Sequence, residues 1–123
     1  MNIFFDTNVL VYAVDAGDPV RKEIAIDRFA RAIKDDTVML STQVLQEFYN
    51  ITTRKLKPPL SAREAAGQLS QLCAFEVVGS SADSVLAASE LAQKHRLQWR
   101  GALILEAAIR GNADVLGSQN GQH

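Results

Sequence analysis

The chain has 123 residues, of which 47% are hydrophobic and 22% charged, so it is long and apolar enough for one globular domain spanning 1–123. Its 13 Lys and Arg residues against 14 Asp and Glu residues give a net charge of −1, which excludes RNA binding by a generally basic surface. The single cysteine, Cys73, excludes an intrachain disulfide and favours a reducing cytoplasm. We expect neither a membrane span nor a signal peptide, because no apolar run approaches the roughly 20 residues that a span needs.

The first predicted elements are a strand and a helix. Residues 2–5 form a short apolar strand that ends at Asp6, and the polar residues that follow predict a turn before the apolar stretch 9–14. A helix begins at Pro19 with Asp18 as its N-cap, because the N–H that proline lacks would be unpaired there. The apolar face of this helix is predicted from residues at i, i+3, i+4 and i+7, namely Ile26, Phe29, Ala30 and Ile33.

A second strand and helix follow. Residues 38–40 are a short buried strand, after which Ser41 or Thr42 caps a helix with an apolar stripe. That stripe consists of Val44, Phe48 and Ile51. At about 100° per residue, Glu47 lies at the margin of the stripe, beside Ile51.

The remaining elements continue the alternation of helices and strands. Ser61 and Glu64 have the spacing of a capping box and start a third helix. Then come a strand at 75–78, helices at 80–95 and 101–110, and a last strand at 114–116. This order predicts a three-layer α/β/α fold with a central parallel sheet.

Polar residues follow the first and last predicted strands. Another polar residue lies early in the helix that follows the second strand. Ligands bind at the carboxyl ends of parallel strands, so Asp6, Glu47, Ser118 and Asn120 are expected to converge there. Two carboxylates in one cleft repel each other unless a cation such as Mg²⁺ or Mn²⁺ binds between them, and such an ion can activate water against a phosphodiester. The alternative is that Asp6 caps a turn and Glu47 is a solvated helix residue.

Four segments, in order, resemble the motifs of PIN domains. They are Phe5–Ala13 (FDTNVLVYA), Leu40–Phe48 (LSTQVLQEF), Ala102–Ala108 (ALILEAA) and Asp114–Ser118 (DVLGS). The resemblance covers nearly the whole chain. It implies a VapC-like toxin: a cytoplasmic, magnesium-dependent endoribonuclease that forms homodimers and is inhibited by an antitoxin partner.

The resemblance also implies roles for individual residues. Asp6 and Glu47 would be the catalytic carboxylates and the metal ligands. Asn8, Ser118 and Asn120 would support the site by hydrogen bonding, although Asn8 is also a common turn former and Ser118 an ordinary loop residue.

The chain departs from the family pattern at two positions where an aspartate is usual. Gly101 stands before the Ala-Leu-Ile run, and the fourth motif reads Ser118-Gln119-Asn120. Hard cations need charged oxygen ligands, so we expect weakened affinity for Mg²⁺ or Mn²⁺ and a ribonuclease activity that is weak or lost. Glu106 lies about 140° around the helix from Gly101 and cannot replace the missing carboxylate; we expect it to be a solvated or partner-facing charge.

The last segment of the chain also departs from the pattern. PIN domains commonly continue with another short strand after the fourth motif, whereas this sequence ends at His123. We therefore expect a fold that is shortened at its carboxyl end, with a sheet edge that is open or completed by a partner chain.

The densest basic cluster, Arg54, Lys55 and Lys57, is a candidate RNA-binding patch. Basic residues also favour helix carboxyl ends, which is an equally good explanation. Arg100 is a further candidate for a phosphate contact.

Two rival functions remain open. A PIN fold with a depleted site can act without catalysis, by binding RNA or an antitoxin. Haloacid-dehalogenase-type phosphatases also place an aspartate after the first strand, but they need a second one two residues later, where this chain has Asn8.

Overall fold

A parallel sheet of four strands forms the centre of the computed structural model, which describes residues 1–117. The strands lie in the order β3-β2-β1-β4. Their bounds are β1 Asn2–Phe5, β2 Thr37–Ser41, β3 Glu76–Val78 and β4 Val115–Gly117. In the register of the sheet, Ile3 lies opposite Val38 on one side and Val115 on the other. The predicted parallel sheet is confirmed, with β1 and β2 at its centre.

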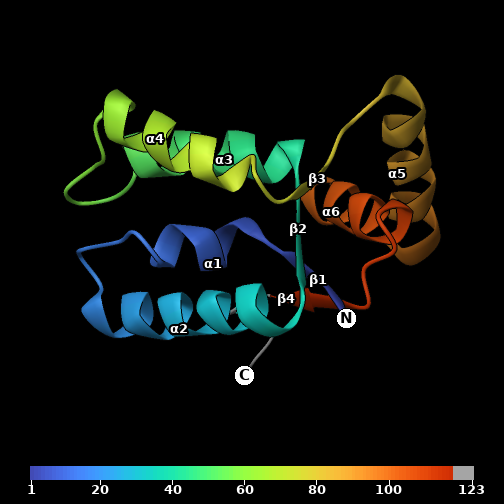
Figure 1. Cartoon of the computed structure of the whole chain (residues 1–123). Helices are drawn as coiled ribbons and strands as arrows, with labels where there is room; N and C mark the ends of the chain where they lie inside the picture. Colours follow the sequence, from blue (N-terminus) through green and yellow to red (C-terminus); the bar gives the residue numbers. More distant parts are fainter. Residues whose placement is uncertain (118–123) are drawn as a thin grey trace.

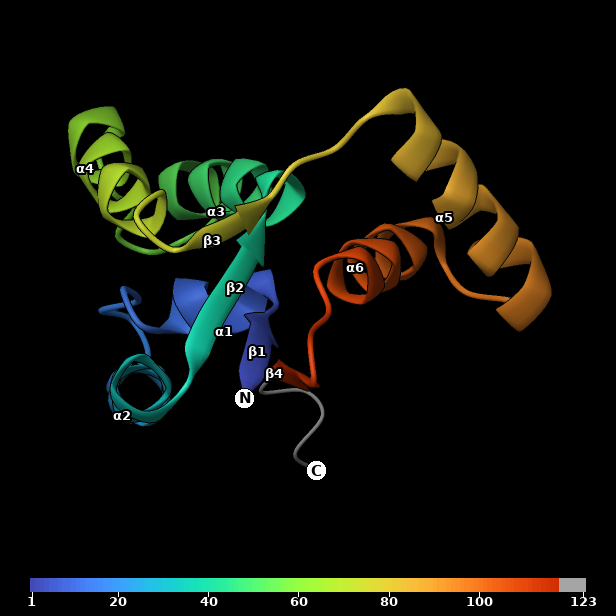
Figure 2. The ribbon, with the colours of Figure 1, turned by 45° about the vertical axis from the view of Figure 1, so that its right-hand side comes forward.

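Helices cover both faces of the sheet (Figures 1 and 2). One layer holds α1 Thr7–Tyr12, α2 Pro19–Asp35, α3 Thr42–Arg54 and α4 Ala62–Leu72. The other holds α5 Ala82–His95 and α6 Trp99–Arg110. The three-layer α/β/α prediction is therefore confirmed. None of the helices in the part of the chain that is described is long and apolar enough to cross a membrane.

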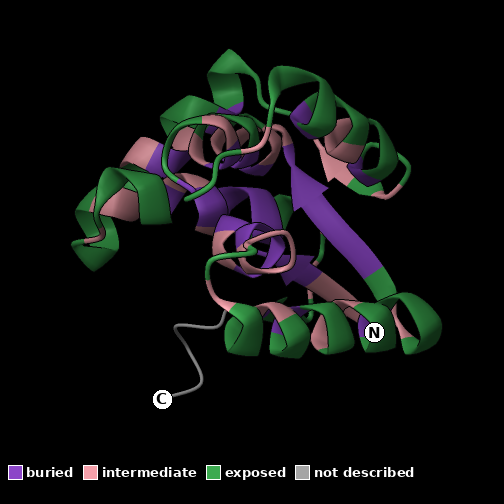
Figure 3. Cartoon of the chain, turned by 90° about the vertical axis from the view of Figure 1, so that its left-hand side faces the viewer, coloured by how far each residue is buried: buried purple, intermediate pink, exposed green. Residues whose placement is uncertain are grey.

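The core lies where the central strands meet the helices around them (Figure 3). Phe4, Phe5 and Leu40 are fully or almost fully buried. Phe5 also packs edge-to-face against Phe29, with ring centroids 5.2 Å apart. Burial of each such side chain contributes roughly 1.5–3 kcal/mol, so the carboxyl end of β1 is held firmly at the site of Asp6.

Several predicted helix starts are confirmed by their caps. The Asp18 side chain accepts from the Arg21 N–H at the start of α2, and the Ser41 hydroxyl accepts from the Val44 N–H at the start of α3. At the start of α4, Ser61 and Glu64 form both hydrogen bonds of the capping box. Polar caps thus mark where these helices begin, as the sequence predicted.

Other predictions about elements were wrong or displaced. The stretch after Asp6 is the helix α1, not a turn, because Asp6 acts as an N-cap and accepts a hydrogen bond from the Thr7 N–H. Helix α5 begins at Ala82, two residues later than expected, and its N-cap Ser81 pairs reciprocally with Ser84. Helix α6 begins at Trp99, two residues earlier than expected.

The face that α2 buries also differs from the prediction. Ile26 and Ile33 are about half exposed, at 48% and 49%, whereas Ala25 and Ala32 are buried. The face of α2 that packs inward therefore carries the small residues Ala25 and Ala32, and the larger Ile26 and Ile33 lie on its outer side. Cys73, the single cysteine, is exposed at the end of α4.

Candidate functional site

Asp6 sits at the carboxyl edge of the sheet, held on both sides by backbone contacts. Its N–H donates to the Gly117 carbonyl of β4 over 3.0 Å, which ties the end of β1 to the neighbouring strand. Its Oδ1 accepts from the Thr7 N–H over 2.6 Å, so the carboxylate caps α1. Both contacts fix the direction of the side chain.

Glu47 approaches the same edge from α3. Its Oε1 accepts a hydrogen bond from the hydroxyl of the fully buried Thr7 over 2.6 Å. Its Oε2 accepts from Nε2 of Gln43, one turn earlier on α3, over 3.2 Å. The convergence that the sequence predicted for Asp6 and Glu47 is therefore present, with Thr7 between them.

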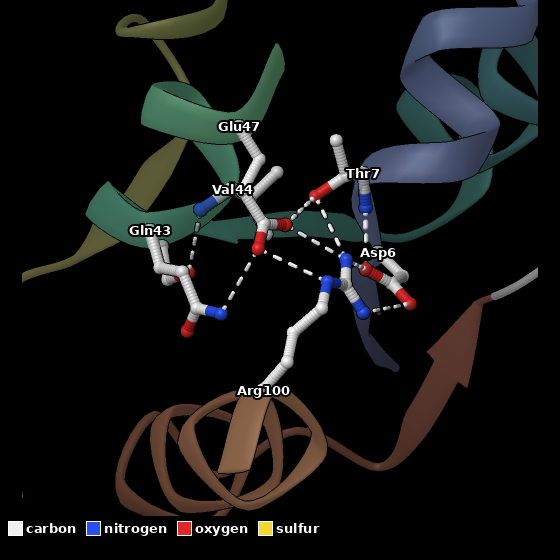
Figure 4. Close-up of polar contacts among 7 residues, drawn as sticks. Asp6, Thr7, Gln43, Val44, Glu47 and Arg100 are labelled. Atoms are coloured by element: carbon white, nitrogen blue, oxygen red, sulfur yellow. Dashed lines mark hydrogen bonds and ion pairs between the residues drawn. The ribbon is translucent and has the colours of Figure 1, made fainter. Parts of the chain in front are cut away.

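Arg100 reaches across the edge of the sheet from α6 and joins the two acids (Figure 4). Its Nη2 donates to Asp6 Oδ1 over 2.6 Å and to Glu47 Oε1 over 2.7 Å. Its Nε donates to Glu47 Oε2 over 3.0 Å, and a longer contact of 3.5 Å runs from Nη1 to Asp6 Oδ2. The guanidinium thus links three elements that are distant in the sequence.

The charges of this cluster do not balance. Two carboxylates and one guanidinium leave a surplus of one negative charge. Hydrogen bonding to Asp6 is the main cause that raises the pKa of Arg100 above its ordinary value, and the contact with Glu47 adds to it, against the effect of partial burial. Arg100 therefore stays protonated and acts as a permanent cation between the two acids.

Gly101, the next residue on α6, is exposed and has open space around it. A Cβ atom built there would meet nothing within 4 Å. The first turn of α6 carries no acidic residue, and its N-cap Gln98 makes no capping hydrogen bond with its side chain. An aspartate would fit this position without a clash, so no steric constraint requires the glycine.

The residues as they stand do not fit a divalent metal. Each of the four carboxylate oxygens of Asp6 and Glu47 already accepts at least one hydrogen bond, all four of them from Arg100. Across residues 1–117, no group of three or more Asp, Glu, His or Cys side chains is arranged to hold a metal ion. A hard cation would have to displace the guanidinium and would then meet only two charged ligands.

The other predicted site residues lie in different places. Asn8 is partly buried in α1, and among the described residues it takes no part in the hydrogen bonds that join Asp6, Glu47 and Arg100. Ser118 and Asn120 lie outside the described residues. Their supporting roles, like the catalytic and metal-binding roles of Asp6 and Glu47, stay predictions.

The basic cluster lies away from this edge. Arg54, Lys55 and Lys57 are exposed around the last residues of α3, whereas Glu47 lies nearer the beginning of that helix. Arg54 lies seven positions after Glu47, which corresponds to about 10 Å along the helix at a rise of 1.5 Å per residue. The structure therefore does not bring the basic cluster together with the acidic pair, and its contact with RNA stays a prediction.

Two contacts of α6 were not predicted from the sequence. Arg100 was considered for a phosphate contact, and nothing local shows its pairing, since its partners lie 94 and 53 residues away. Glu106 was expected to be a solvated or partner-facing charge, but it is buried, and its carboxylate accepts hydrogen bonds from Arg110 over 2.8 Å and 3.0 Å. The i,i+4 spacing of Glu106 and Arg110 was a local signal for that second pair.

Comparison with known proteins agrees with this fold. A toxin of Mycobacterium tuberculosis that cleaves the sarcin–ricin loop, VapC20, has a similar structure, with a TM-score of 0.76 and 21% identity over 98% of this chain and 91% of that one. The structure of VapBC2 from Rickettsia felis, bound to a DNA fragment of its promoter, is also similar. Its TM-score is 0.67, and its sequence identity is 20% over 95% of this chain and 86% of that one. No curated protein matches the chain by sequence. The family model of the PIN domain matches residues 3–123, and the chain therefore belongs to the PIN-domain family.

Proposed function

We propose that this protein is a VapC-like toxin of the PIN family that acts on RNA, and that its own metal-dependent phosphodiester cleavage is weak or lost. PIN-domain nucleases are generally metal-dependent, and the fold shared with VapC20 supports an RNA-directed role. The reduced activity is supported by the contacts of the acidic pair. Asp6 and Glu47 are the carboxylates that the family would use, and here both are bound to Arg100.

The charge of the cluster also supports weak cleavage. Attack on a phosphodiester builds up negative charge, which enzymes stabilise with cations or with hydrogen-bond donors aimed at the reacting atoms. In this site the donors of Arg100 point at Asp6 and Glu47, and the cluster as a whole keeps one negative charge. A phosphate that enters would meet net repulsion unless another cation came with it.

Cleavage of an RNA in MgCl₂ or MnCl₂ tests this function. The substrate is a labelled RNA hairpin, and the rate is compared for the unchanged protein and for Asp6→Asn. We expect little or no cleavage by the unchanged protein, and any residual cleavage at this site is expected to stop in the variant. Fast, magnesium-dependent cleavage that Asp6→Asn abolishes would contradict the proposal of a weak site.

A second candidate is binding without catalysis, to RNA or to an antitoxin. It is favoured by the same closed cluster, because a site whose acids are all hydrogen-bonded needs no metal to be stable. The similar structure VapBC2 is named as a complex of two proteins, and this supports an antitoxin as a partner to test for this chain. Fluorescence anisotropy with a labelled RNA, in the absence of divalent ions, distinguishes RNA binding from no interaction.

The assembly and location of the protein complete the proposal. We infer a homodimer in the cytoplasm, with apolar residues on the outer side of α5 as one candidate contact. Val85 and Leu86 are 42% and 66% exposed there. Analytical ultracentrifugation of the unchanged protein and of Leu86→Lys tests the dimer, because a charge in an apolar interface should shift the protein toward monomer.

A further inference from the structure

We propose that Arg100 is a built-in cation that competes with divalent metals for Asp6 and Glu47, so that Arg100 and Gly101 together keep this site free of metal. The proposal deepens the proposed function, because it assigns a cause to the weak site. The experiment below measures metal binding and not RNA cleavage. The proposal on Arg100 can therefore fail while the proposed function stands, and the proposed function can fail while the proposal on Arg100 stands.

The guanidinium of Arg100 has a shape that suits the two acids. Its planar fork presents several N–H donors, and here Nε and Nη2 engage both oxygens of Glu47 while Nη2 also reaches Asp6. The oxygens that would bind a metal are therefore the oxygens that Arg100 binds. Charge-assisted, two-point contacts of this kind are among the stronger hydrogen bonds in proteins. A metal and the guanidinium cannot occupy the same oxygens at once.

Arg100 is held by the two acids and not by its own helix. It lies in the first turn of α6, where the backbone N–H groups give the helix end a partial positive charge. A cation there is electrostatically unfavourable, and no acidic residue in that turn offsets it. The side chain is 45% exposed, so it can turn into solvent once its two partners are taken. Asp6 and Glu47 are what keep it in place.

The residue that follows Arg100 in α6 is a glycine, Gly101. It is surrounded by open space, and a Cβ atom built there meets no atom within 4 Å. An aspartate at this position would add a carboxylate to the first turn of α6, next to Arg100 in the sequence. It would also complement the positive end of α6. The chain thus combines an added cation at one position with a missing anion at the next.

Isothermal titration calorimetry of the whole chain with MnCl₂ alone tests the proposal. The proteins are the unchanged chain, Arg100→Ala, and the double variant Arg100→Ala with Gly101→Asp. We expect no saturable binding by the unchanged protein at millimolar MnCl₂. Arg100→Ala should bind Mn²⁺ at least about tenfold more tightly, because the metal no longer displaces a charge-assisted pair. The double variant should gain about another tenfold from its third carboxylate.

Matched controls tie the effect to this cluster. Arg110→Ala removes an arginine of similar exposure from the same helix, 40% against 45%, and should leave Mn²⁺ binding as it is in the unchanged protein. Glu47→Gln, added to Arg100→Ala, should remove the gain, because one of the two charged ligands is lost. Arg100→Lys keeps the charge without the fork and should fall between the unchanged protein and Arg100→Ala.

Two results would overturn the proposal. One is tight, micromolar Mn²⁺ binding by the unchanged protein, which would mean that Arg100 does not compete. The other is Arg100→Ala that keeps its helical circular dichroism and binds Mn²⁺ no more tightly than the unchanged chain. If Arg100→Ala does not fold, Arg100→Lys decides the matter: binding equal to that of the unchanged protein contradicts the proposal.

Discussion

Helix α6 carries an arginine near each end, and the two are used differently. Near the amino end, Arg100 bridges Asp6 and Glu47, which come from the end of β1 and from α3. At the carboxyl end, Arg110 pairs with Glu106 on the same helix, four residues earlier. The first cluster keeps a surplus of one negative charge, and the second is balanced. The Arg100 contacts therefore join different layers of the fold, whereas the Arg110 contact stabilises a single helix.

The helix dipole sharpens this contrast. Arg110 lies in the last turn of α6, where a cation is favourable, whereas Arg100 lies in the first turn, where it is not. Arg110 would be well placed without Glu106, but Arg100 depends on its acids. An arginine kept in an unfavourable position by two carboxylates is the feature that sets this site apart from an ordinary surface ion pair.

The largest expected effect is that of Arg100→Ala on stability. Its loss leaves the partly buried carboxylates of Asp6 and Glu47 facing each other without a cation. We expect a loss of about 2 kcal/mol in the free energy of unfolding, below the roughly 3–5 kcal/mol for breaking a buried pair because Arg100 is 45% exposed. Urea denaturation measures it. A loss no larger than that of Arg110→Ala would remove the distinction between the two arginines.

Thr7→Val is expected to have the next largest effect. Thr7 is fully buried, and its hydroxyl donates to Glu47 over 2.6 Å. Valine keeps the shape but removes the donor, so the carboxylate loses a partner at a loss of about 1–2 kcal/mol. Urea denaturation of Thr7→Val and Thr7→Ser, which keeps the hydroxyl, measures this contribution. An effect confined to Thr7→Ser would point to packing in place of the hydrogen bond.

Arg110→Ala should have a smaller effect, about 1 kcal/mol. The Glu106 side chain is 10% exposed, and it would lose its partner, but only a local i,i+4 contact is broken. Thermal unfolding of the unchanged protein, Arg110→Ala and Glu106→Gln measures the contribution of this pair to stability. A loss well above that of Arg100→Ala would reverse the order proposed for the two ends of α6.

The smallest effect on stability is expected for Glu64. Its contact with Ser61 is as local as that of Arg110 with Glu106. Hydrogen bonds from the Ser61 backbone and hydroxyl lower the pKa of Glu64 below its ordinary value of 4.5. Because the folded-state pKa is lowered, the stabilisation is present above the unfolded pKa and is lost as the pH falls through the folded one. The difference in stability between the unchanged protein and Glu64→Gln should therefore shrink below about pH 4.5. Urea denaturation at several pH values measures it, and a difference independent of pH contradicts it.

Much of the fold was predictable because its signals are local. The caps at Asp18, Ser41 and Ser61 lie beside the helices they start. The parallel direction of the strands follows from the alternation of strands and helices. The helix after Asp6 was missed because Asp, Thr and Asn are turn formers as well as caps. The outward-facing Ile26 and Ile33 were misplaced because periodicity alone does not tell which of two possible faces packs closely.

The candidate site was predictable only in part, for a related reason. Asp6 and Glu47 follow strands whose carboxyl ends meet, so their convergence follows from topology. Arg100 has no such signal, since its partners are 94 and 53 residues away and its helix position argues against a cation. A side chain that is placed against its local preference becomes understandable only when its tertiary partners are known.

Arg100, and not a metal, is the cation bound between Asp6 and Glu47. The most direct measurement is a crystal structure of the unchanged protein grown in millimolar MnCl₂, with anomalous data for manganese. We predict the Arg100 guanidinium between the two carboxylates and no anomalous peak beside them. A manganese ion bound to both Asp6 and Glu47, with Arg100 turned into solvent, would contradict the claim.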